Sequence, residues 1–379
     1  ILTLTGVAFF RVALLPEFGR ELSMSTFQLG VVTTVFAVGR LVADLPGGHF
    51  ADRVRARRLM ALSAGGVALG SVILGLSLVA LPVYLASFLL GISSATTNAT
   101  GMTFFSNVTH AGYRGTSMAI FSAALLGGQA VGPTAAGLIS SVGGWRVAMF
   151  VGTAAAGITA LVLLTARSIS PSSIGVPRQP DRHSTQPGRG TPSLGQLVVL
   201  QSVAFAVFLT LGAVPQTMVP IIGADELGLN SAAIGLALGV GGLARFVGTI
   251  IGGRLSDRLS RKTALVPGLL VQGFGVALLA LDPSVVVWMT AIVVMSLSSF
   301  AISVAATILG DITDPDRVGM QLGRFRFVGD LGLIAGPLLV TSLFQGLGRE
   351  EAFLFVAGVL TAAALLSWQF LPETGDVGA

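Results

Sequence analysis

The sequence predicts an all-α membrane protein with twelve transmembrane helices in two pseudo-symmetric six-helix bundles. Of the 379 residues, 53% are apolar and only 10% are charged, whereas a soluble protein has about 25% charged residues. Apolar runs of about 20 residues, the length that crosses a bilayer, follow one another along the chain. The two halves of the chain also share sequence motifs at a nearly constant offset, which indicates a duplicated bundle.

The twelve apolar runs lie between breaks that are charged or rich in Pro and Gly. We interpret each run as one transmembrane helix. Because the first run begins at Ile1 without a methionine, we also expect further residues upstream. The expected helices are 1–18, 27–48, 59–78, 81–106, 115–140, 145–166, 194–222, 231–253, 263–281, 283–309, 323–346 and 351–371.

Residues 167–193 interrupt this pattern with five prolines and four arginines. A segment this polar cannot bury enough apolar surface to fold by itself. It is therefore predicted to be a cytoplasmic linker. The linker divides the chain into an N-terminal bundle at 1–166 and a C-terminal bundle at 194–379.

The loops differ in their content of basic residues, and this difference predicts the orientation. With the amino terminus in the cytoplasm, the outer loops hold only Arg20, Arg146 and Arg349. Cytoplasmic loops of membrane proteins carry the excess of Lys and Arg, so both termini are expected to be cytoplasmic in a multi-pass inner-membrane protein. The inner loops hold Arg53, Arg55, Arg57, Arg58, Arg114, Arg167, Arg178, Arg182, Arg189, Arg254, Arg258, Arg261, Lys262 and Arg317.

Composition excludes several classes of function. The chain has no cysteine, which excludes a thiolate zinc site and a cysteine nucleophile. His49, His110 and His183 share no ligand spacing, so no metal or other cofactor is expected. There is no P-loop and no nucleophile elbow, which argues against an enzyme and against ATP-driven transport. The net charge of +5 arises at the edges of apolar runs, so nucleic acid is not an expected partner.

A repeated segment relates the two halves. The segment from Gly39 reads GRLVADLPGGHFADRVRARR, and the segment from Ala244 reads ARFVGTIIGGRLSDRLSRK. A second pair, GGQAVGP ending at Pro133 and LGLIAGP ending at Pro337, lies 204 positions apart. The pairs that lie 205 positions apart are Arg40 and Arg245, Gly48 and Gly253, Asp52 and Asp257, and Arg53 and Arg258.

The residues from Gly48 to Arg58 resemble the loop 2–3 signature of the major facilitator superfamily, G-x-L-x-D-R-x-G-R-R/K. Arg55 replaces the second glycine, and Ala56 replaces the basic residue after it. The resemblance implies the major facilitator fold, a monomer, and a gate in which a carboxylate lies near the amino end of the eleventh helix. The alternative is that these arginines only fix topology. The gating residues it implies are Gly48, Asp52, Arg53 and Arg57, with Gly253, Asp257, Arg258 and Lys262 in loop 8–9.

The fifth expected helix carries Gly128, Gly132 and Pro133, and it resembles the G-x-x-x-G-P-x-x-G-G signature of proton-driven exporters, including drug:proton antiporters. Ala136 stands for the first of the paired glycines. The eleventh helix repeats the motif as Gly332, Gly336 and Pro337. Proline kinks a helix and glycines four apart make a flat face, so the motif serves either a rocking interface or packing alone. In these families an arginine four residues before a glycine in the fourth helix is linked to proton coupling, and here Ser87 holds that position before Gly91.

Charged residues inside membrane helices are costly, so they are functional candidates by default. Arg40 and Asp44, like Arg326 and Asp330, are four residues apart and can pair on one helix face. Together they form either a proton-sensitive cytoplasmic latch or a set of static ion pairs. The charges expected within the membrane are Arg11, Arg40, Asp44, Arg245, Arg324, Arg326 and Asp330.

Arg11 and Arg245 lack an evident acidic partner in the sequence. Two guanidinium groups in a central cavity can bind an anionic substrate, and the symmetry-related Arg40 and Arg245 can form the same pair. The alternative is that they bond backbone carbonyls or stabilise a gate. The uncharged residues Ser94, Asn98, Ser299 and Ser303 form matched pairs at the 205 offset. They suit either a polar part of a substrate or hydrogen bonds between helices.

The leading hypothesis is proton-coupled export of a small molecule by rocker-switch alternating access. The expected partners are the small-molecule substrate, protons and the lipid bilayer. No acid is expected in the first, fourth, seventh or tenth helix, which argues against a mainly cationic substrate. The alternatives are uptake or exchange of an organic anion through an arginine-lined cavity and, in a different class, a non-transporting membrane sensor.

Overall fold

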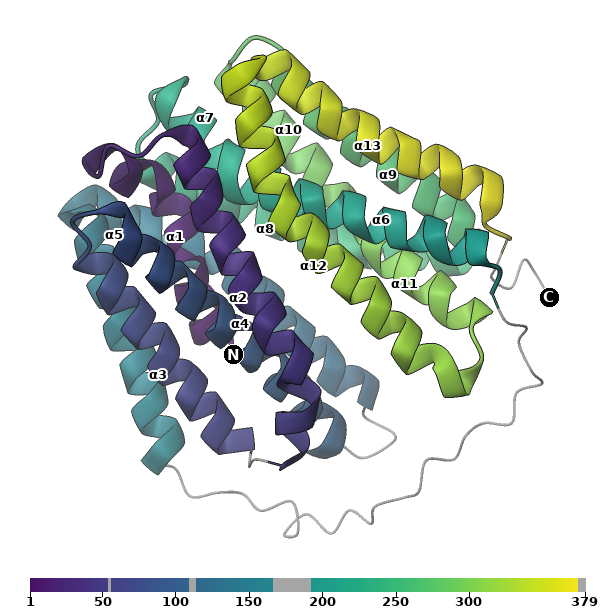
Figure 1. Cartoon of the computed structure of the whole chain (residues 1–379), viewed down its shortest axis with the longest axis horizontal. Coiled ribbons are helices and arrows are strands. Elements are labelled where there is room, and N and C mark those ends of the chain that lie inside the picture. The colour runs from purple at the N-terminus through teal and green to yellow at the C-terminus, as the bar shows by residue number, and fades with distance from the viewer. Residues whose placement is uncertain (54–55, 109–113, 166–191, 374–379) are drawn as a thin grey trace. The chain divides into compact units, whose positions relative to one another are not determined.

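The structure, a computed structural model, describes residues 1–53, 56–108, 114–165 and 192–373. All regular elements in these ranges are helices (Figure 1). The chain divides into two compact units. Unit 1 contains the helices before the 167–193 segment together with Leu229–Gly242. Unit 2 contains the described residues 192–228 and those from Leu243 onward.

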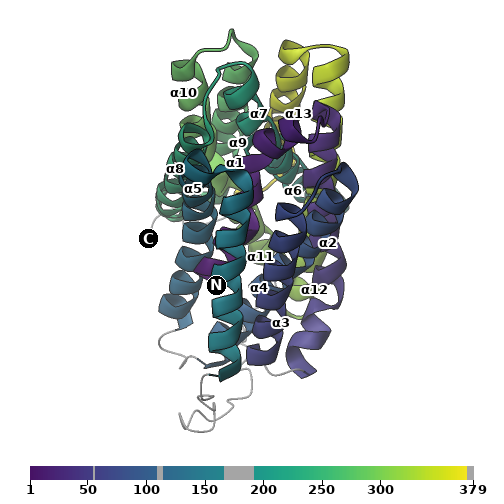
Figure 2. The ribbon, with the colours of Figure 1, turned by 90° about the vertical axis from the view of Figure 1, so that its left-hand side faces the viewer.

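Unit 1 is built around its first helix, which is buried at every residue from Leu4 to Pro16. This helix packs most extensively against α5, whereas α2 packs on α4. α3 and α5 run side by side along the unit (Figure 2). The helices of unit 1 are α1 (Leu2–Glu21), α2 (Thr26–Arg53), α3 (Ala56–Gly75), α4 (Ala80–Val108) and α5 (Arg114–Thr165), with the first half of α8 (Ser231–Arg258).

The long helix α5 contains two membrane spans. Its 52 residues include Gly144, whose φ of 80° is not helical. At 1.5 Å per residue this segment is more than twice as long as the hydrocarbon core of about 30 Å is thick. Eleven described helical segments are long and apolar enough to span a membrane. With α5 divided at Gly144 they make twelve spans, so the expected all-α fold is confirmed.

Unit 2 contains the remaining spans. α6, η3 and α7 together form one span, and α10, η5 and α11 form another. α6 packs most extensively against α12. The elements are α6 (Leu194–Ala213), η3 (Val214–Met218), α7 (Val219–Asp225), α9 (Arg261–Ala277), η4 (Leu278–Ala280), α10 (Val285–Leu297), η5 (Ser298–Phe300), α11 (Ala301–Ile312), α12 (Pro315–Gly346) and α13 (Arg349–Phe370), with the second half of α8.

Several helices are longer than their apolar runs. α12 begins at Pro315, eight residues before the expected start at 323, and α8 ends at Arg258 instead of 253. The added turns carry charged side chains, which a hydropathy pattern excludes. Backbone hydrogen bonding continues regardless of side-chain polarity, so a helix can extend past its apolar segment.

The span made by α6 and α7 is interrupted by a π-helix at Val214–Met218. Pro215 and Pro220 lack backbone N–H groups, which disturbs the regular ladder. Side chains bond to carbonyls in this region: Thr217 Oγ1 donates to the Gly212 carbonyl at 2.9 Å, and Trp288 Nε1 donates to the Val219 carbonyl at 3.2 Å.

The duplication is visible at the turn after the first span of each unit. Ser23 has a φ of 53° and Gly228, 205 positions later, has a φ of 64°. Each turn is followed by a side chain that caps the next helix. Ser25 Oγ accepts from the Gln28 backbone N–H at 3.3 Å, and Asn230 Oδ1 accepts from that of Ala233 at 2.9 Å. The repeat therefore extends to backbone conformation.

We expect the replacement Ser23→Gly to raise the stability of the protein by about 1 kcal/mol, because a left-handed conformation costs a non-glycine residue about that much. Gly228→Ala is the matched control and should lower stability by about the same amount. Thermal unfolding in detergent, followed by circular dichroism, measures both. The interpretation is wrong if the two replacements shift the unfolding temperature in the same direction.

Candidate functional site

An arginine cluster lies where α1 and α2 meet in unit 1. Arg11 on α1 is fully buried, and its guanidinium carbon is 3.9 Å from the ring centroid of Phe36 on α2. This is a cation–π contact. Arg40 follows Phe36 by four residues, so it lies on the same face of α2 as the ring that Arg11 contacts. Two of the three arginines predicted to bind an anion therefore lie together.

The crossing of α2 and α4 positions Arg40. A Cβ at Gly39 would overlap the Phe88 carbonyl oxygen, and one at Gly91 would lie 3.1 Å from the Arg40 backbone nitrogen. The two helix backbones are therefore in direct contact. Ser87, one turn before Gly91, is fully buried, and its hydroxyl bonds to none of the described residues. Where the exporter-type pattern has an arginine on the fourth helix, this chain has Ser87, and the Arg40 backbone lies beside Gly91, one turn further along.

The polar residues of α4 divide into two sets. Ser63 of α3 donates to the Ser93 carbonyl at 2.7 Å and lies 2.5 Å from the Thr97 hydroxyl. Ser94 and Asn98, each one position further along, form no side-chain hydrogen bond with the part of the chain that the structure describes. The helix–helix bonds thus use the neighbouring residues and leave this predicted pair available.

The matching residues in unit 2 are arranged differently. Ser299 Oγ donates to the Ser296 carbonyl at 2.8 Å, within its own helix, and Ser303 is exposed. Ser299 therefore uses its hydroxyl on the backbone.

The other intramembrane charges are distributed over both units. Asp330 on α12 is 1% exposed, and Arg245 is half-buried on the second half of α8, in unit 2. No hydrogen bond or ion pair between Arg40 and Asp44 occurs among the described residues. Arg326 is exposed on α12. A latch built from Arg40, Asp44, Arg326 and Asp330 stays a prediction.

The glycine–proline motifs make close contacts within each unit. A Cβ at Gly128 would lie 2.7 Å from the Leu2 carbonyl oxygen, and one at Gly132 would overlap that of Gly6. In unit 2 the Cβ positions of Gly332 and Gly336 would overlap the carbonyls of α6 at Phe205 and Leu209. Pro133 and Pro337 follow in the same helices, at equivalent positions. Each motif therefore brings its helix against the first helix of its unit.

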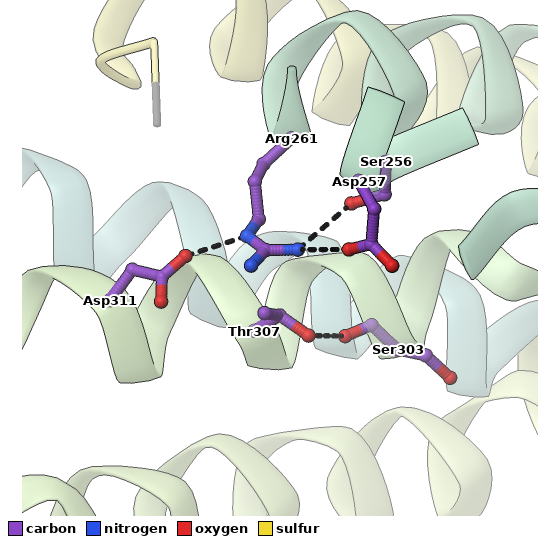
Figure 3. Close-up of polar contacts among 6 residues, drawn as sticks. All are labelled: Ser256, Asp257, Arg261, Ser303, Thr307 and Asp311. Carbon is purple, nitrogen blue, oxygen red and sulfur yellow. Dashed lines mark hydrogen bonds and ion pairs between the residues drawn. The ribbon is translucent and has the colours of Figure 1, made fainter. Parts of the chain in front are cut away.

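Loop 8–9 holds a charged cluster around Arg261 (Figure 3). Its Nε donates to Asp311 Oδ2 at 2.6 Å, and its Nη1 donates to Ser256 Oγ at 3.3 Å and Asp257 Oδ1 at 3.2 Å. Asp257 was expected in this site, but Arg261 and Asp311 are additional members. Asp257 lies near the end of α8 and Arg261 begins α9, so this pair spans the turn between them, whereas the link to Asp311 on α11 is tertiary.

The other predicted residues of this loop point elsewhere. Lys262 Nζ is 5.0 Å from the Trp368 ring on α13, while Arg258 and Gly253 are exposed. In loop 2–3, Gly48, Asp52 and Arg53 fall within α2, but their side chains lie outside the described residues. Arg57 is exposed in the first turn of α3.

The expectation that the first helix carries no acid is wrong. Glu17 already lies within the expected helix 1–18, and α1 continues further to Glu21. The Glu17 carboxylate accepts hydrogen bonds from Ser140 of α5 and Ser231 of α8. Glu21 pairs with Arg146. The argument against a cationic substrate therefore does not hold.

No group of three or more His, Asp or Glu that could hold a metal ion is found among the described residues. The fold and these sites define a multi-pass membrane transporter made of two helical bundles. The sequence matches the model of the Major Facilitator Superfamily over residues 1–221 and 201–378. The chain belongs to this superfamily, whose members are transporters, so the expectation that it is not an enzyme is confirmed.

Relatives of known name are similar over part of the chain. The inner membrane transport protein YnfM of Escherichia coli K12 is 28% identical over 189 residues, 49% of this chain and 45% of YnfM. The D-galactonate transporter of E. coli O6:H1 is 29% identical over 48% of this chain and 42% of its own length. The class G tetracycline resistance protein of Vibrio anguillarum is 28% identical over 41% of each chain. The matched region thus spans less than half of these relatives.

Solved structures are similar over nearly the whole chain. An inward-facing, occupied bacterial homologue of the human lysosomal transporter Spinster has a TM-score of 0.75 at 17% identity, covering 97% of this chain and 94% of its own. The inward-open xylose transporter XylE from E. coli has a TM-score of 0.75 at 15% identity, covering 98% and 95%. These similarities confirm the major facilitator fold.

We expect the two carboxylates around Arg261 to differ in their contribution to stability. Asp311→Asn should lower it by about 1 kcal/mol, because this pair is short and three-quarters buried. Asp257→Asn should lower the stability by less than half as much, because that carboxylate is 72% exposed. Thermal unfolding of both variants in detergent measures the difference, and a larger loss for Asp257→Asn would contradict the assigned geometry.

Proposed function

We propose that this protein is a secondary transporter that exports a small molecule in exchange for protons by alternating access. The observation that carries the proposal is the geometry of the exporter-type motif in α5. Gly132 packs on α1, whereas Pro133 and Gly137 pack on the first half of α8, where a Cβ at Gly235 would lie 2.5 Å from the Pro133 carbonyl oxygen. The motif thus supplies close contact on two sides of one helix, as a moving interface requires.

Relatives named for drug resistance support the direction. The class G and class C tetracycline resistance proteins are 28% and 27% identical to this chain, and the multidrug resistance protein MdtH of Aeromonas hydrophila is 28% identical. Resistance to a drug is what these names share, and export of a drug-like compound is a way to provide it. Ser87 takes the place of the arginine tied to proton coupling in such families, so the proton site in this chain is assigned to carboxylates.

The antiport proposal predicts that substrate binding releases protons. Purified protein at low buffering capacity should acidify the medium when a transported compound is added from a panel of lipophilic cations, neutral drugs and organic acids. If Asp44 or Asp330 binds the proton, as the sequence predicts, the double replacement Asp44→Asn and Asp330→Asn should abolish the release. Arg324→Gln, which changes an exposed charge on α12, is the matched control.

Proteoliposomes complete this test. An imposed pH gradient should drive accumulation of the same compound, and an uncoupler should collapse it. Binding without proton release would overturn antiport. An absence of flux, with binding intact, would instead favour the non-transporting sensor.

A second candidate function is transport of an organic anion, and the proximity of Arg11 and Arg40 favours it. Two guanidinium groups that repel each other are relieved when an anion binds between them. Ser87, on the helix that crosses at Gly91, adds a hydroxyl that bonds to none of the described residues. The similarity to a D-galactonate transporter is in keeping with such a substrate.

For this candidate we expect Arg40→Gln to weaken the binding of organic acids at least tenfold, which is about 1.4 kcal/mol. Arg40→Lys should weaken the binding of organic acids less, because lysine keeps the positive charge although it cannot form the bidentate contact. Binding of neutral compounds should change less than twofold. Isothermal titration with the same panel measures all three, and equal weakening for neutral and anionic compounds would show that Arg40 only maintains the fold.

A further inference from the structure

Glu17 has an unusual set of partners in unit 1. Its Oε2 accepts a hydrogen bond from the Ser140 hydroxyl of α5, and its Oε1 accepts one from the Ser231 hydroxyl of α8. Both serines are buried, at 4% and 3% exposure. One half-buried carboxylate of α1 therefore connects two other helices, with one oxygen assigned to each.

The two connected helices meet along a line of small residues, which we call the α5–α8 seam. A Cβ at Gly137 would overlap the Ser231 carbonyl oxygen, so the first turn of α8 lies directly on α5. Further along the seam, Thr134 Oγ1 donates to the Gly235 carbonyl at 3.0 Å. A Cβ at Gly242 would overlap Ala130. The seam consists of backbone contacts and hydroxyl bonds, and Glu17 closes one end of it.

The charged groups around Glu17 come from few elements. On α1 they are Arg20, which is exposed, and Glu21, which binds Arg146 and accepts from Trp145 Nε1 at 2.5 Å. Arg11 lies six residues earlier. α5 has no titratable residue between Arg114 and Arg146, α8 has none before Arg245, and α2, whose Leu29 packs on Gly19, has none before Arg40. The hydrogen-bond donors that α5 and α8 supply to the Glu17 carboxylate are therefore serine hydroxyls.

The internal repeat separates Glu17 from the structural pairs of the fold. Glu21 pairs with Arg146 in unit 1, and Glu226 pairs with Arg349 at the equivalent place in unit 2. The residue 205 positions after Glu17 is Ile222, which is fully buried. The shared architecture of the two bundles therefore does not require a carboxylate here. A hydrogen-bonded acid that only one half carries indicates a task that only one half performs.

We propose that Glu17 is the proton-binding site of the transport cycle and that its ionised form holds the α5–α8 seam closed. This inference rests on the proton antiport proposed above and assigns its proton to α1. The ionised carboxylate accepts two charge-assisted bonds, which are about twice as strong as neutral ones. Protonation removes the charge and gives one oxygen an O–H group, so both bonds that the serines donate weaken.

The position of Glu17 indicates from which side of the membrane the proton comes and which helix contact its binding loosens. The end of α1 and the start of α8 flank loops that are poor in basic residues, which places Glu17 toward the expected outer face. α8 is one continuous helix from Ser231 to Arg258 whose second half belongs to unit 2. Loosening of its first turns from α5 therefore frees the helix that continues into the other unit. A proton from outside would open the seam, as antiport requires.

The first test is compound-induced proton release from the detergent-solubilised full chain. We expect Glu17→Gln to reduce the release to less than a tenth of that of the unaltered protein while compounds still bind. Glu21→Gln, one turn away on the same helix, is the matched control and should retain release. The assignment would be overturned, and antiport left intact, if Glu17→Gln still released protons while the double variant Asp44→Asn and Asp330→Asn released none.

The second test measures the contact between α5 and α8 directly, by disulfide cross-linking, and does not depend on transport. Because the chain has no cysteine, the pair Thr134→Cys and Gly239→Cys can be oxidised without interference. A Cβ at Gly239 would lie 3.5 Å from that of Thr134, within the range of a disulfide. At one fixed pH above neutrality, adding Glu17→Gln should slow the cross-linking several-fold, whereas adding Glu21→Gln should not.

The two tests distinguish the possible failures. If the unaltered protein releases no proton with any compound, the antiport proposal fails, and Glu17 is then not a coupling site. If cross-linking is equally fast with Glu17 and with the Glu17→Gln replacement, the carboxylate does not hold the seam, and the inference is overturned even where proton release is normal. Slower cross-linking together with lost release supports both parts.

Discussion

The structure depends on direct contact between helix backbones at glycine. In a bilayer there is no hydrophobic gain from bringing two apolar helices together, so van der Waals packing and hydrogen bonds must hold them. This chain meets that constraint at Gly132 against Gly6, Gly91 against Phe36, and Gly336 against Leu209. In each case a single methyl group would overlap a backbone carbonyl oxygen, so these contacts fix both the spacing and the register of the helices.

The same close contacts determine where polar groups can lie. Because α2 and α4 touch at Gly91, the Arg40 backbone lies beside Gly91, one turn beyond Ser87, and Phe36 on the same helix contacts Arg11. The fully buried guanidinium of Arg11 is surrounded by protein and does not face lipid, which is the condition under which a membrane helix tolerates a charge. The arginine cluster is thus a consequence of helix packing as well as a candidate binding site.

Much of the fold follows from the sequence because its signals are local. Apolar runs, the polar 167–193 segment and the repeat between Arg40 and Arg245 each depend on residues close together in the chain or on direct comparison of the halves. Helix ends were less predictable, since turns such as 315–322 are polar but remain hydrogen-bonded. The contacts of Asp311 and Glu17 were not predictable, because their partners lie 50 or more residues away.

The repeat also helps to separate architecture from function. Features present in both halves, such as the pairs of Glu21 and Glu226 with their arginines, maintain the bundle. Other groups have no counterpart 205 positions later: Arg11 corresponds to Gln216, Glu17 to Ile222, and Ser87 to Ile292, and all three of these counterparts are buried. If the fold needed charge or a hydroxyl at these positions, both halves would have kept it. Unmatched ionisable groups occur in both units, since Asp330 of unit 2 corresponds to Leu125, and they are the residues at which function is best tested. Unit 2 contributes the π-helical break at Val214–Met218 and the cluster around Arg261. A two-fold scaffold that performs vectorial transport needs such a division, because a fully symmetric protein would offer the same chemistry to both of its halves.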